Sequence, residues 1–306
     1  MDPLSEVISL LKPRSYAFRG LSAGGDWALA FPPGPGIRCY AIVDGACRLE
    51  RVGAPILRLS AGDVVLLSDG KPFVLAGGAV VDPVPAVAFL SATDSGHVAT
   101  MNGGGDLVGL GGYFAFQSTH ANLLMDALPP VTLVNEPSTG LRLRNAIEGL
   151  LTELRDPQPG GALIAEHLAQ SLLVQALRLH LVPAMDRGAS WLSGLTDPRI
   201  SPVMTAMHAE PGKRWALADL ARLAGMSRSA FAARFSAVVG QPALSYLTQW
   251  RMTLAAEQLM TTRTTLAALA VSLGYESEGA LSTAFKRRYG RSPRAFVPRA
   301  PGSGHS

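Results

Sequence analysis

Cysteine is nearly absent from this chain, with two among 306 residues, and this excludes a disulfide framework. Aromatic residues make up only 7% and charged residues 16% of the sequence. No uninterrupted apolar run is long enough to cross a bilayer. The first residues include an acidic side chain and only a short apolar run, so we expect no signal peptide and a cytoplasmic protein.

Signatures of catalysis are also missing. The sequence has no glycine-rich phosphate loop, no convincing pair of catalytic carboxylates and no Ser/His/Asp arrangement. The six histidines are scattered, and we expect structural or surface roles for His120, His167, His180 and His208. We therefore expect no catalytic site and no cofactor.

Positive charge is concentrated at one end of the chain. From residue 197 onward there are 14 Lys and Arg against 6 Asp and Glu, whereas the residues before it hold 13 and 17. The length predicts two domains. A basic final third is typical of a surface that binds phosphates, so nucleic acid is the expected partner.

The last hundred residues contain one pattern twice, roughly fifty residues apart. The first copy, Leu217–Pro242, is LADLARLAGMSRSAFAARFSAVVGQP, and the second, Leu266–Pro293, is LAALAVSLGYESEGALSTAFKRRYGRSP. Each predicts a short helix, a turn at Gly225 or Gly274 and a second helix, which is a helix-turn-helix. Ser227 is the expected cap of the first copy's second helix.

In each copy, the second helix is expected to enter a DNA major groove with its N-terminal end. By helix geometry, the exposed N-terminal faces of these two helices carry Arg228, Ser229, Ala232, Ala233, Glu278, Gly279, Ser282 and Thr283. Arg228 suits guanine and Glu278 suits cytosine, while the small residues leave much specificity to DNA shape. The expected phosphate contacts are Lys286, Arg287, Arg288 and Arg291. For Arg234, between two aromatic anchors, a structural role is the alternative.

Between the two copies, Pro242–Met260 has no glycine and is predicted to form one helix. Its length is roughly 28 Å, at about 1.5 Å per residue. The DNA repeat is roughly 34 Å. Such a helix can therefore hold two recognition helices near successive turns of one DNA face.

The segment from Trp215 to Phe296 resembles the DNA-binding domain of the AraC/XylS family of bacterial transcription regulators. The resemblance is carried by LAGMSRSAFAARF, YLTQWRM and GYESE followed by FKRRYGRSP. Residues 197–211 and those before them resemble the subgroup with a cupin-like sensory barrel. The resemblance implies that the exposed positions Arg228, Ser229, Ala232, Ala233, Glu278, Gly279, Ser282 and Thr283 face base edges. It also implies three partners, which are double-stranded promoter DNA, RNA polymerase and a second copy of the chain in a homodimer.

The first half has the composition of an antiparallel barrel, with short apolar runs separated by turns across residues 15–110. The expected strands are 27–31, 37–43, 47–52, 56–59, 64–67, 73–75 and 86–90. Asp44-Gly45 suits a two-residue hairpin turn within residues 37–50. That hairpin would put Cys39 and Cys47 on opposite faces, so we expect both thiols to stay reduced.

The stretch Gly62–Phe73, GDVVLLSDGKPF, resembles the second cupin motif. Phe73 stands where the metal-binding form has histidine, and Arg38-Cys39-Tyr40 stands near the usual HxH pair. The resemblance therefore implies a ligand-binding or vestigial pocket without metal. The candidate pocket residues are Trp27, Phe31, Tyr40, Phe73 and Phe89, with Arg38 or Lys71 as a polar anchor.

Two helices are predicted at 141–155 and 162–182, as a dimer seam or as simple domain packing. The predicted organisation is a cupin-like domain (1–185), a linker (186–197), a DNA-binding domain (198–300) and a disordered tail (301–306). The expected fold is multidomain α+β, with an antiparallel barrel plus helices and an all-α domain of two helix-turn-helix motifs joined by a linker helix.

The expected function is sequence-specific DNA binding in transcription regulation, controlled by a small molecule in the barrel. One alternative is a regulator whose vestigial barrel responds to redox state or to a protein partner. The other is a cupin-type enzyme, against which the missing histidines and the duplicated motif argue. The sequence leaves open the effector, the target genes and the choice between activation and repression.

Overall fold

The computed structural model describes residues 2–92, 98–116, 122–135, 141–180, 189–262 and 264–297, without the side chains of 14–17, 122, 123 and 180. The expected tail, 301–306, lies outside these residues. The chain forms two compact units, one of residues Leu11–Val182 and one that joins Met1–Leu10 to Pro183–Ser306. The limits predicted for the cupin-like domain, the linker and the DNA-binding domain remain predictions.

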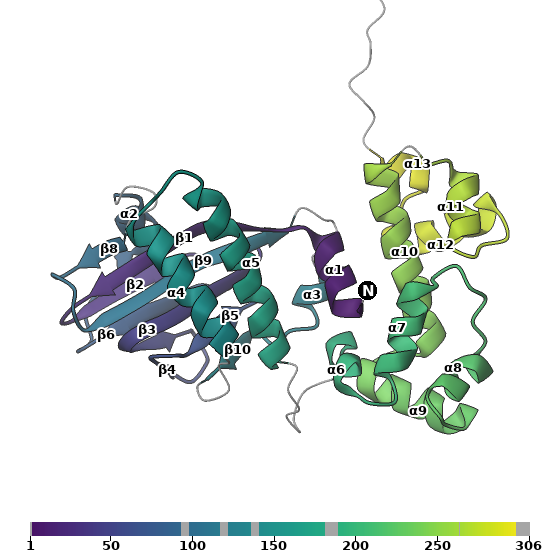
Figure 1. Ribbon diagram of the computed structural model, residues 1–306, viewed down its shortest axis with the longest axis horizontal. Helices are drawn as coiled ribbons and strands as arrows, with labels where there is room; N and C mark the ends of the chain where they lie inside the picture. Colours follow the sequence, from purple (N-terminus) through teal and green to yellow (C-terminus); the bar gives the residue numbers. More distant parts are fainter. Residues whose placement is uncertain are drawn as a thin grey trace, which may run out of the picture. The chain divides into compact units, whose positions relative to one another are not determined.

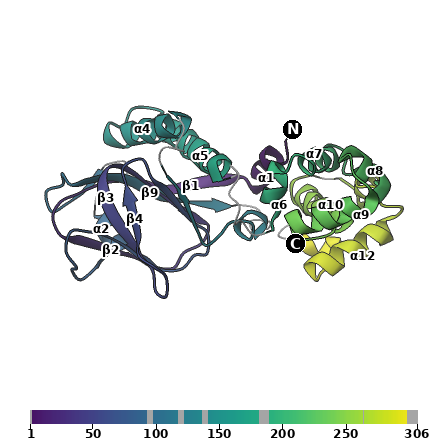
Figure 2. The ribbon, with the colours of Figure 1, turned by 90° about the horizontal axis from the view of Figure 1, so that it is seen from below.

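The first unit is built on a curled sheet that forms a cupin-like half-barrel (Figures 1 and 2). Its strands are β1 (Pro13–Ala23), β2 (Trp27–Phe31), β3 (Ile37–Glu50), β4 (Leu57–Ser60), β5 (Val64–Leu67), β6 (Phe73–Gly77), β7 (Val84–Pro85), β8 (Val98–Met101), β9 (Leu107–Phe116) and β10 (Val131–Val134). The main strand order is β7-β2-β6-β3-β9-β1-β8, with β4, β5 and β10 joined to it at β3 and β5. Pairing is antiparallel except for β1 with β8 and β2 with β7.

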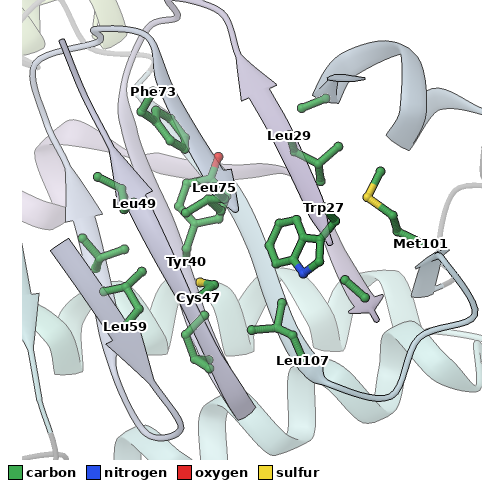
Figure 3. Packing of buried hydrophobic residues seen from close by; sticks show 14 of the residues in the cluster. Trp27, Leu29, Tyr40, Cys47, Leu49, Leu59, Phe73, Leu75, Met101 and Leu107 are labelled. Carbon is green, nitrogen blue, oxygen red and sulfur yellow. The ribbon is translucent and has the colours of Figure 1, made fainter. Parts of the chain in front are cut away.

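Alternate residues of these strands point into the barrel and form its core. Figure 3 shows side chains from β2, β3 and β6, such as Trp27, Tyr40 and Leu75, gathered on one side of the sheet. Burial of this apolar surface is the main stabilising contribution to the unit.

The predicted hairpin at Asp44-Gly45 is wrong, because β3 runs through this dipeptide without turning back. Asp44 pairs with Val108 and Gly45 with Leu107, both on β9, after a register shift that follows Ile42. Gly45 has φ +76°, and a Cβ there would lie 1.9 Å from the Asp106 carbonyl oxygen. The dipeptide that suits a hairpin turn therefore forms a bulge in a long strand, because a distant partner strand pairs across it.

Two further strand predictions need correction. Residues 86–90 form part of a helix, α2 (Ala86–Ser91), instead of a strand. Five strands were not predicted from the sequence, namely β1, β7, β8, β9 and β10. The predicted barrel ends at residue 110, whereas β10 extends to residue 134. In β9, four consecutive positions from Gly109 to Gly112 include three glycines, which weakened the strand pattern.

The two predicted helices after the barrel are confirmed as α4 (Leu141–Arg155) and α5 (Gly161–His180). They lie across one face of the sheet, which leaves the other face as the barrel interior (Figure 2). The buried side of α4 is apolar and includes Leu143, Ile147 and Leu150. A short helix, α3 (Asn122–Met125), precedes β10.

The second unit is helical. It contains α1 (Pro3–Leu11), α6 (Trp191–Thr196), α7 (Ser201–Ala209), α8 (Leu217–Leu223), α9 (Arg228–Val239), α10 (Ala243–Thr261), α11 (Leu266–Ser272), α12 (Glu278–Tyr289) and α13 (Pro293–Phe296). In the segment predicted as a linker, α6 is ordered and buries Trp191 and Leu192. Within the described residues of either unit, no helix is long and apolar enough to cross a membrane.

Candidate nucleic-acid interface and barrel cavity

The first predicted helix-turn-helix is formed by α8 and α9. Gly225 occupies the turn with φ +63°, a left-handed conformation that favours glycine. Ser227 caps α9, and its side-chain oxygen accepts a hydrogen bond from the Ala230 amide at 3.3 Å. Phe231 and Phe235 are fully buried with ring centres 5.7 Å apart, so they anchor the inner face of α9.

The second copy repeats this construction with α11 and α12. Gly274 has φ +75°, and a Cβ there would lie 2.1 Å from the Gly212 carbonyl oxygen. Ser277 caps α12 by accepting from the Ala280 amide at 3.1 Å. Leu281 and Phe285 are buried in the same way as Phe231 and Phe235. Both motifs therefore follow from the same local signals in the sequence.

The predicted base-contacting residues lie on the outer faces of α9 and α12. Arg228, Ser229 and Ala233 are exposed on α9, and Glu278, Gly279 and Thr283 are exposed on α12. Ala232 and Ser282, on the same faces, are half-buried. The Thr283 hydroxyl donates to the Gly279 carbonyl at 2.9 Å, which leaves its oxygen free only to accept. These residues remain predicted DNA contacts.

The four predicted phosphate contacts gather where α12 ends. Lys286, Arg287 and Arg288 are exposed in its last turn, and Arg291 directly follows Gly290, which ends the helix. The Arg291 guanidinium lies over the Phe296 ring, 4.5 Å from its centre. Glu278 opens the same helix, where its negative charge suits the positive end of the helix dipole. The C-terminal end of α12 is thus strongly basic.

Other arginines of this unit have structural partners. Arg234 forms an ion pair with Asp197 at 2.8 Å, which confirms the structural alternative. Burial raises the pKa of Asp197, but hydrogen bonds from Arg234 and from the amides of Arg199 and Ile200 outweigh it and hold that pKa below its ordinary value. Arg251 donates to the carbonyl oxygens of Pro211 and Lys213 at 2.6 and 2.8 Å.

The ion pair of Asp197 and the hydrogen bonds of Arg251 to carbonyl oxygens were not predicted from the sequence. No local pattern shows that Arg251 on α10 reaches carbonyl groups about forty residues earlier in the chain. The net positive charge of the sequence therefore overstates the charge that is available to phosphates.

The predicted linker helix is confirmed as α10, which passes through both helix-turn-helix halves (Figure 1). Near its start, Tyr246 packs against Phe235 of α9 with ring centres 6.0 Å apart. Further along, Met252, Ala255 and Ala256 are buried in a core that also contains Phe285 of α12. Because both motifs pack on one continuous helix, their spacing is set by α10.

The barrel unit holds a cavity of about 360 Å³. Its walls come mainly from β2, β3 and β9, with α2 and residues 32–35 at the rim, where Val87 and Ser91 are exposed. Four of the predicted pocket residues line it, namely Trp27, Phe31, Arg38 and Tyr40. The volume falls in the range of small-molecule sites.

Three other predicted pocket residues do not line the cavity. Phe73 lies behind the wall, stacked on Phe31 with ring centres 4.7 Å apart and edge-on to Tyr40 at 5.3 Å. Phe89 packs against the core, and Lys71 is exposed. Phe73 and Phe89 therefore support the wall, and Arg38 is the anchor that reaches the cavity.

Arg38 is buried, with 8% of its surface exposed. On β3 it shares the inward face with Tyr40 and Ile42. Its Nη2 donates to the Pro32 carbonyl oxygen at 2.5 Å, and its guanidinium carbon lies 5.3 Å from the centre of the Phe73 ring. Within the described part of the chain, its Nη1 has no hydrogen-bond partner.

Cys39 and Cys47 are free and buried. Burial raises the pKa of both thiols, that of Cys47 to about 12, so both stay protonated and unreactive near neutral pH. The two residues lie on one strand, separated by roughly 26 Å at about 3.3 Å per residue. A disulfide needs Cα atoms within about 7 Å. The prediction of no intrachain bond therefore rests on strand length instead of on a hairpin.

The part of the chain that the structure describes contains no cluster of three or more His, Cys, Asp or Glu side chains that could hold a metal ion. Phe73, at the histidine position of the metal-binding cupin motif, packs against the rings of Phe31 and Tyr40.

Comparison with known proteins agrees with this architecture. Residues 2–182 match the family model described as Cupin, and residues 220–299 match the model described as Helix-turn-helix domain. The chain is 42% identical, over 96% of its length and 97% of the relative's, to an AraC-like transcription regulator of Streptomyces lividans. It is 29% identical, over 98% of both chains, to the RCS-specific HTH-type transcriptional activator RclR of Escherichia coli.

A solved structure of the DNA-binding domain of AdpA in complex with a target DNA matches 33% of this chain and 89% of its own, at 30% identity and a TM-score of 0.31. The whole-length identity to AraC-like regulators and the two matched models cover both units. The chain therefore belongs to the AraC family of DNA-binding transcription regulators, with a cupin domain before its helix-turn-helix domain.

Proposed function

We propose that a small molecule bound in the barrel cavity controls DNA binding by this regulator, which acts in the cytoplasm and is not an enzyme. The observation that carries the proposal is the cavity of about 360 Å³ inside the cupin unit. Its walls are mostly apolar side chains with few polar groups, as is typical of ligand sites. A chain that combines such a cavity with a DNA-binding domain has the two parts that a ligand-controlled regulator needs.

At the DNA, α9 and α12 contact bases in successive major-groove segments of one promoter face. Arg228 pairs with guanine in one segment and Glu278 accepts from cytosine in the other. The basic end of α12 binds phosphates, which positions the unit without specifying sequence. A homodimer and an encounter with RNA polymerase complete the proposal, by resemblance to the family.

The test is a promoter reporter in cells with a variant that blocks the cavity mouth. Val87 lines the cavity and is 59% exposed, so Val87→Trp closes the entrance without overpacking the core. Val52→Trp is the matched control, since Val52 is fully exposed and does not line the cavity.

We expect Val87→Trp to abolish the response to conditions that induce the wild type, while Val52→Trp keeps it. Both variants should bind promoter DNA in vitro like the wild type. A normal response in Val87→Trp would contradict control through this cavity and favour a vestigial barrel that responds to a protein partner.

A further inference from the structure

Within the described residues, a buried positive charge without a counter-charge lies in the wall of the barrel cavity. Arg38 and Arg19 line it, and none of the described lining residues is Asp or Glu. Burying an unpaired charge is unfavourable, because the charge loses its hydration. The guanidinium of Arg38 therefore needs a negatively charged partner, and the described residues of the chain do not provide one.

Neighbouring groups hold the Arg38 guanidinium in one orientation. The Pro32 carbonyl oxygen accepts from Nη2, and the guanidinium carbon lies over the Phe73 ring, 5.3 Å from its centre. Phe73 is itself fixed by its stacking on Phe31. These contacts leave Nη1, which has no partner within the described residues although the side chain is more than nine-tenths buried.

The rest of the cavity is suited to a hydrocarbon body. Trp27 and Leu29 contribute from β2, Leu75 from β6 and Leu107 from β9 (Figure 3). These side chains are almost wholly buried in the barrel core. The binding free energy of an occupant therefore becomes more favourable in proportion to the apolar surface that it buries.

We propose that the effector is a hydrophobic carboxylate, whose single negative charge binds Nη1 of Arg38 while its apolar body fills the cavity. This inference rests on the proposed sensory role of the barrel. A carboxylate matches the planar donor geometry of a guanidinium and neutralises one buried charge. An alcohol of the same shape can accept a hydrogen bond but leaves the charge uncompensated.

The test compares matched acids and alcohols by titration calorimetry on the purified full-length protein. The probes are decanoate with decan-1-ol, and phenylbutyrate with phenylbutanol. We expect at least one acid to bind about tenfold or more tightly than its alcohol, because hydrogen bonds to a charged group are worth more than neutral ones.

Variants at one residue then locate the interaction. Arg38→Met keeps the length of the side chain and should weaken acid binding about tenfold or more, while alcohol binding changes little. Arg38→Lys keeps the charge and should restore part of the acid preference. Arg58→Met is the matched control, because Arg58 is exposed on β4 and lies outside the cavity.

If an alcohol binds as tightly as its acid, or if Arg38→Met keeps the acid preference, the carboxylate inference is overturned while a ligand-controlled barrel remains. If neither acid binds, the inference is also overturned. The Val87→Trp reporter experiment tests the sensory role of the barrel separately. If Arg38→Met does not fold, the ratio of acid affinity to alcohol affinity in the wild type and in Arg38→Lys tests the inference instead.

Discussion

At the scale of single residues, His208 shows how burial determines protonation. Its ring stacks on Trp250 with centres 4.0 Å apart, and its Nδ1 and Nε2 lie 3.0 Å from Glu6 Oε2 and 2.7 Å from the Tyr246 hydroxyl. Burial lowers the pKa of His208 to about 3, so the ring is neutral. A carboxylate only accepts, so Nδ1 donates to Glu6 and Nε2 accepts from Tyr246. The contact with Glu6 is therefore a hydrogen bond and not an ion pair.

This burial predicts a pH-dependent stability. The folded-state pKa of His208 lies below the ordinary 6.5, so the unfolded chain binds a proton first and stability is lost as the pH falls from about 6.5 toward 3. From pH 6.5 to 5.5 the loss from this residue is about 1 kcal/mol. Urea unfolding of the wild type and His208→Gln at both pH values measures it.

The variant should lose less stability than the wild type over this interval. Glu6 titrates beside His208, and burial raises its pKa, which acts in the opposite direction. Glu6 is present in both proteins, and a glutamine at position 208 can still donate a hydrogen bond to it, so the difference between them comes mainly from the histidine. Equal losses would show that folding does not lower the pKa of His208.

Arg228 and Glu278 give the second residue-scale prediction. Arg228→Ala should weaken binding to the promoter by about 1–3 kcal/mol if its guanidinium pairs with a base, and it should relax sequence preference in one half-site. Glu278→Ala should relax preference in the other half-site. Fluorescence anisotropy with base-pair substitutions in each half-site measures both.

A change of preference at the same base pairs in both variants would contradict the arrangement of two motifs on successive turns. Arg234→Ala is the control, because Arg234 pairs with Asp197 on the protein. It should lower stability by about 1 kcal/mol, since the pair is partly exposed, and leave the preferred sequence unchanged.

At the scale of elements, β3 and the helix-turn-helix helices show which local signals are decisive. Caps such as Ser227 and Ser277 and the turn glycines act on the residues beside them, so the helices appear where the pattern predicts them. Asp44-Gly45 suits a turn equally well by local criteria. The partner strand β9, about sixty residues later, makes this dipeptide a bulge. Local chemistry therefore defines a helix end better than it defines the pairing of strands.

The length of β3 leads to a prediction about the thiols. Cys39 and Cys47 are buried and far apart along this strand, so a Cys39→Ser/Cys47→Ser variant should keep regulation in the reporter assay. Mass spectrometry after mild oxidation should find both thiols reduced. A Cys39–Cys47 crosslink that changes DNA affinity would contradict this and favour the redox-responsive alternative.

At the scale of the whole molecule, residues from both ends of the chain combine in one unit. Met1–Leu10 packs with the C-terminal residues, and Glu6 reaches His208 across about two hundred positions. Trp191 and Leu192 of α6 are buried in the same unit. A fragment that begins at residue 197 would lose both α1 and α6 from this unit, whereas one that begins at residue 189 loses α1 and keeps α6.

The fragment 189–306 should bind duplex DNA with strong salt dependence, because each phosphate contact releases counterions at a slope of about −0.9. Replacing Arg287 and Arg288 by Ala should reduce the slope by about 2. Anisotropy across a range of salt concentrations measures the slope. Absence of binding at low salt to any duplex would contradict the assignment of this unit.

Metal analysis gives the last prediction. Purified full-length protein should carry no stoichiometric transition metal in the barrel, since Phe73 and Arg38-Cys39-Tyr40 occupy the usual cupin ligand positions. Elemental analysis by mass spectrometry measures it. One iron, zinc or manganese per chain, lost on mutation of this region, would reopen the cupin-type enzyme.

The sequence by itself determined the two helix-turn-helix motifs, α10, α4 and α5, and the barrel class, because caps, glycine turns and apolar periodicity act between near neighbours. It also identified Arg38 as a possible anchor. Only the tertiary structure decided that Phe73 supports the cavity wall, that Arg234 and Arg251 are structural, and that α1 joins the C-terminal unit. Each of these depends on a partner far away in the chain, and such long-range pairing leaves no periodic signal in the residues around it.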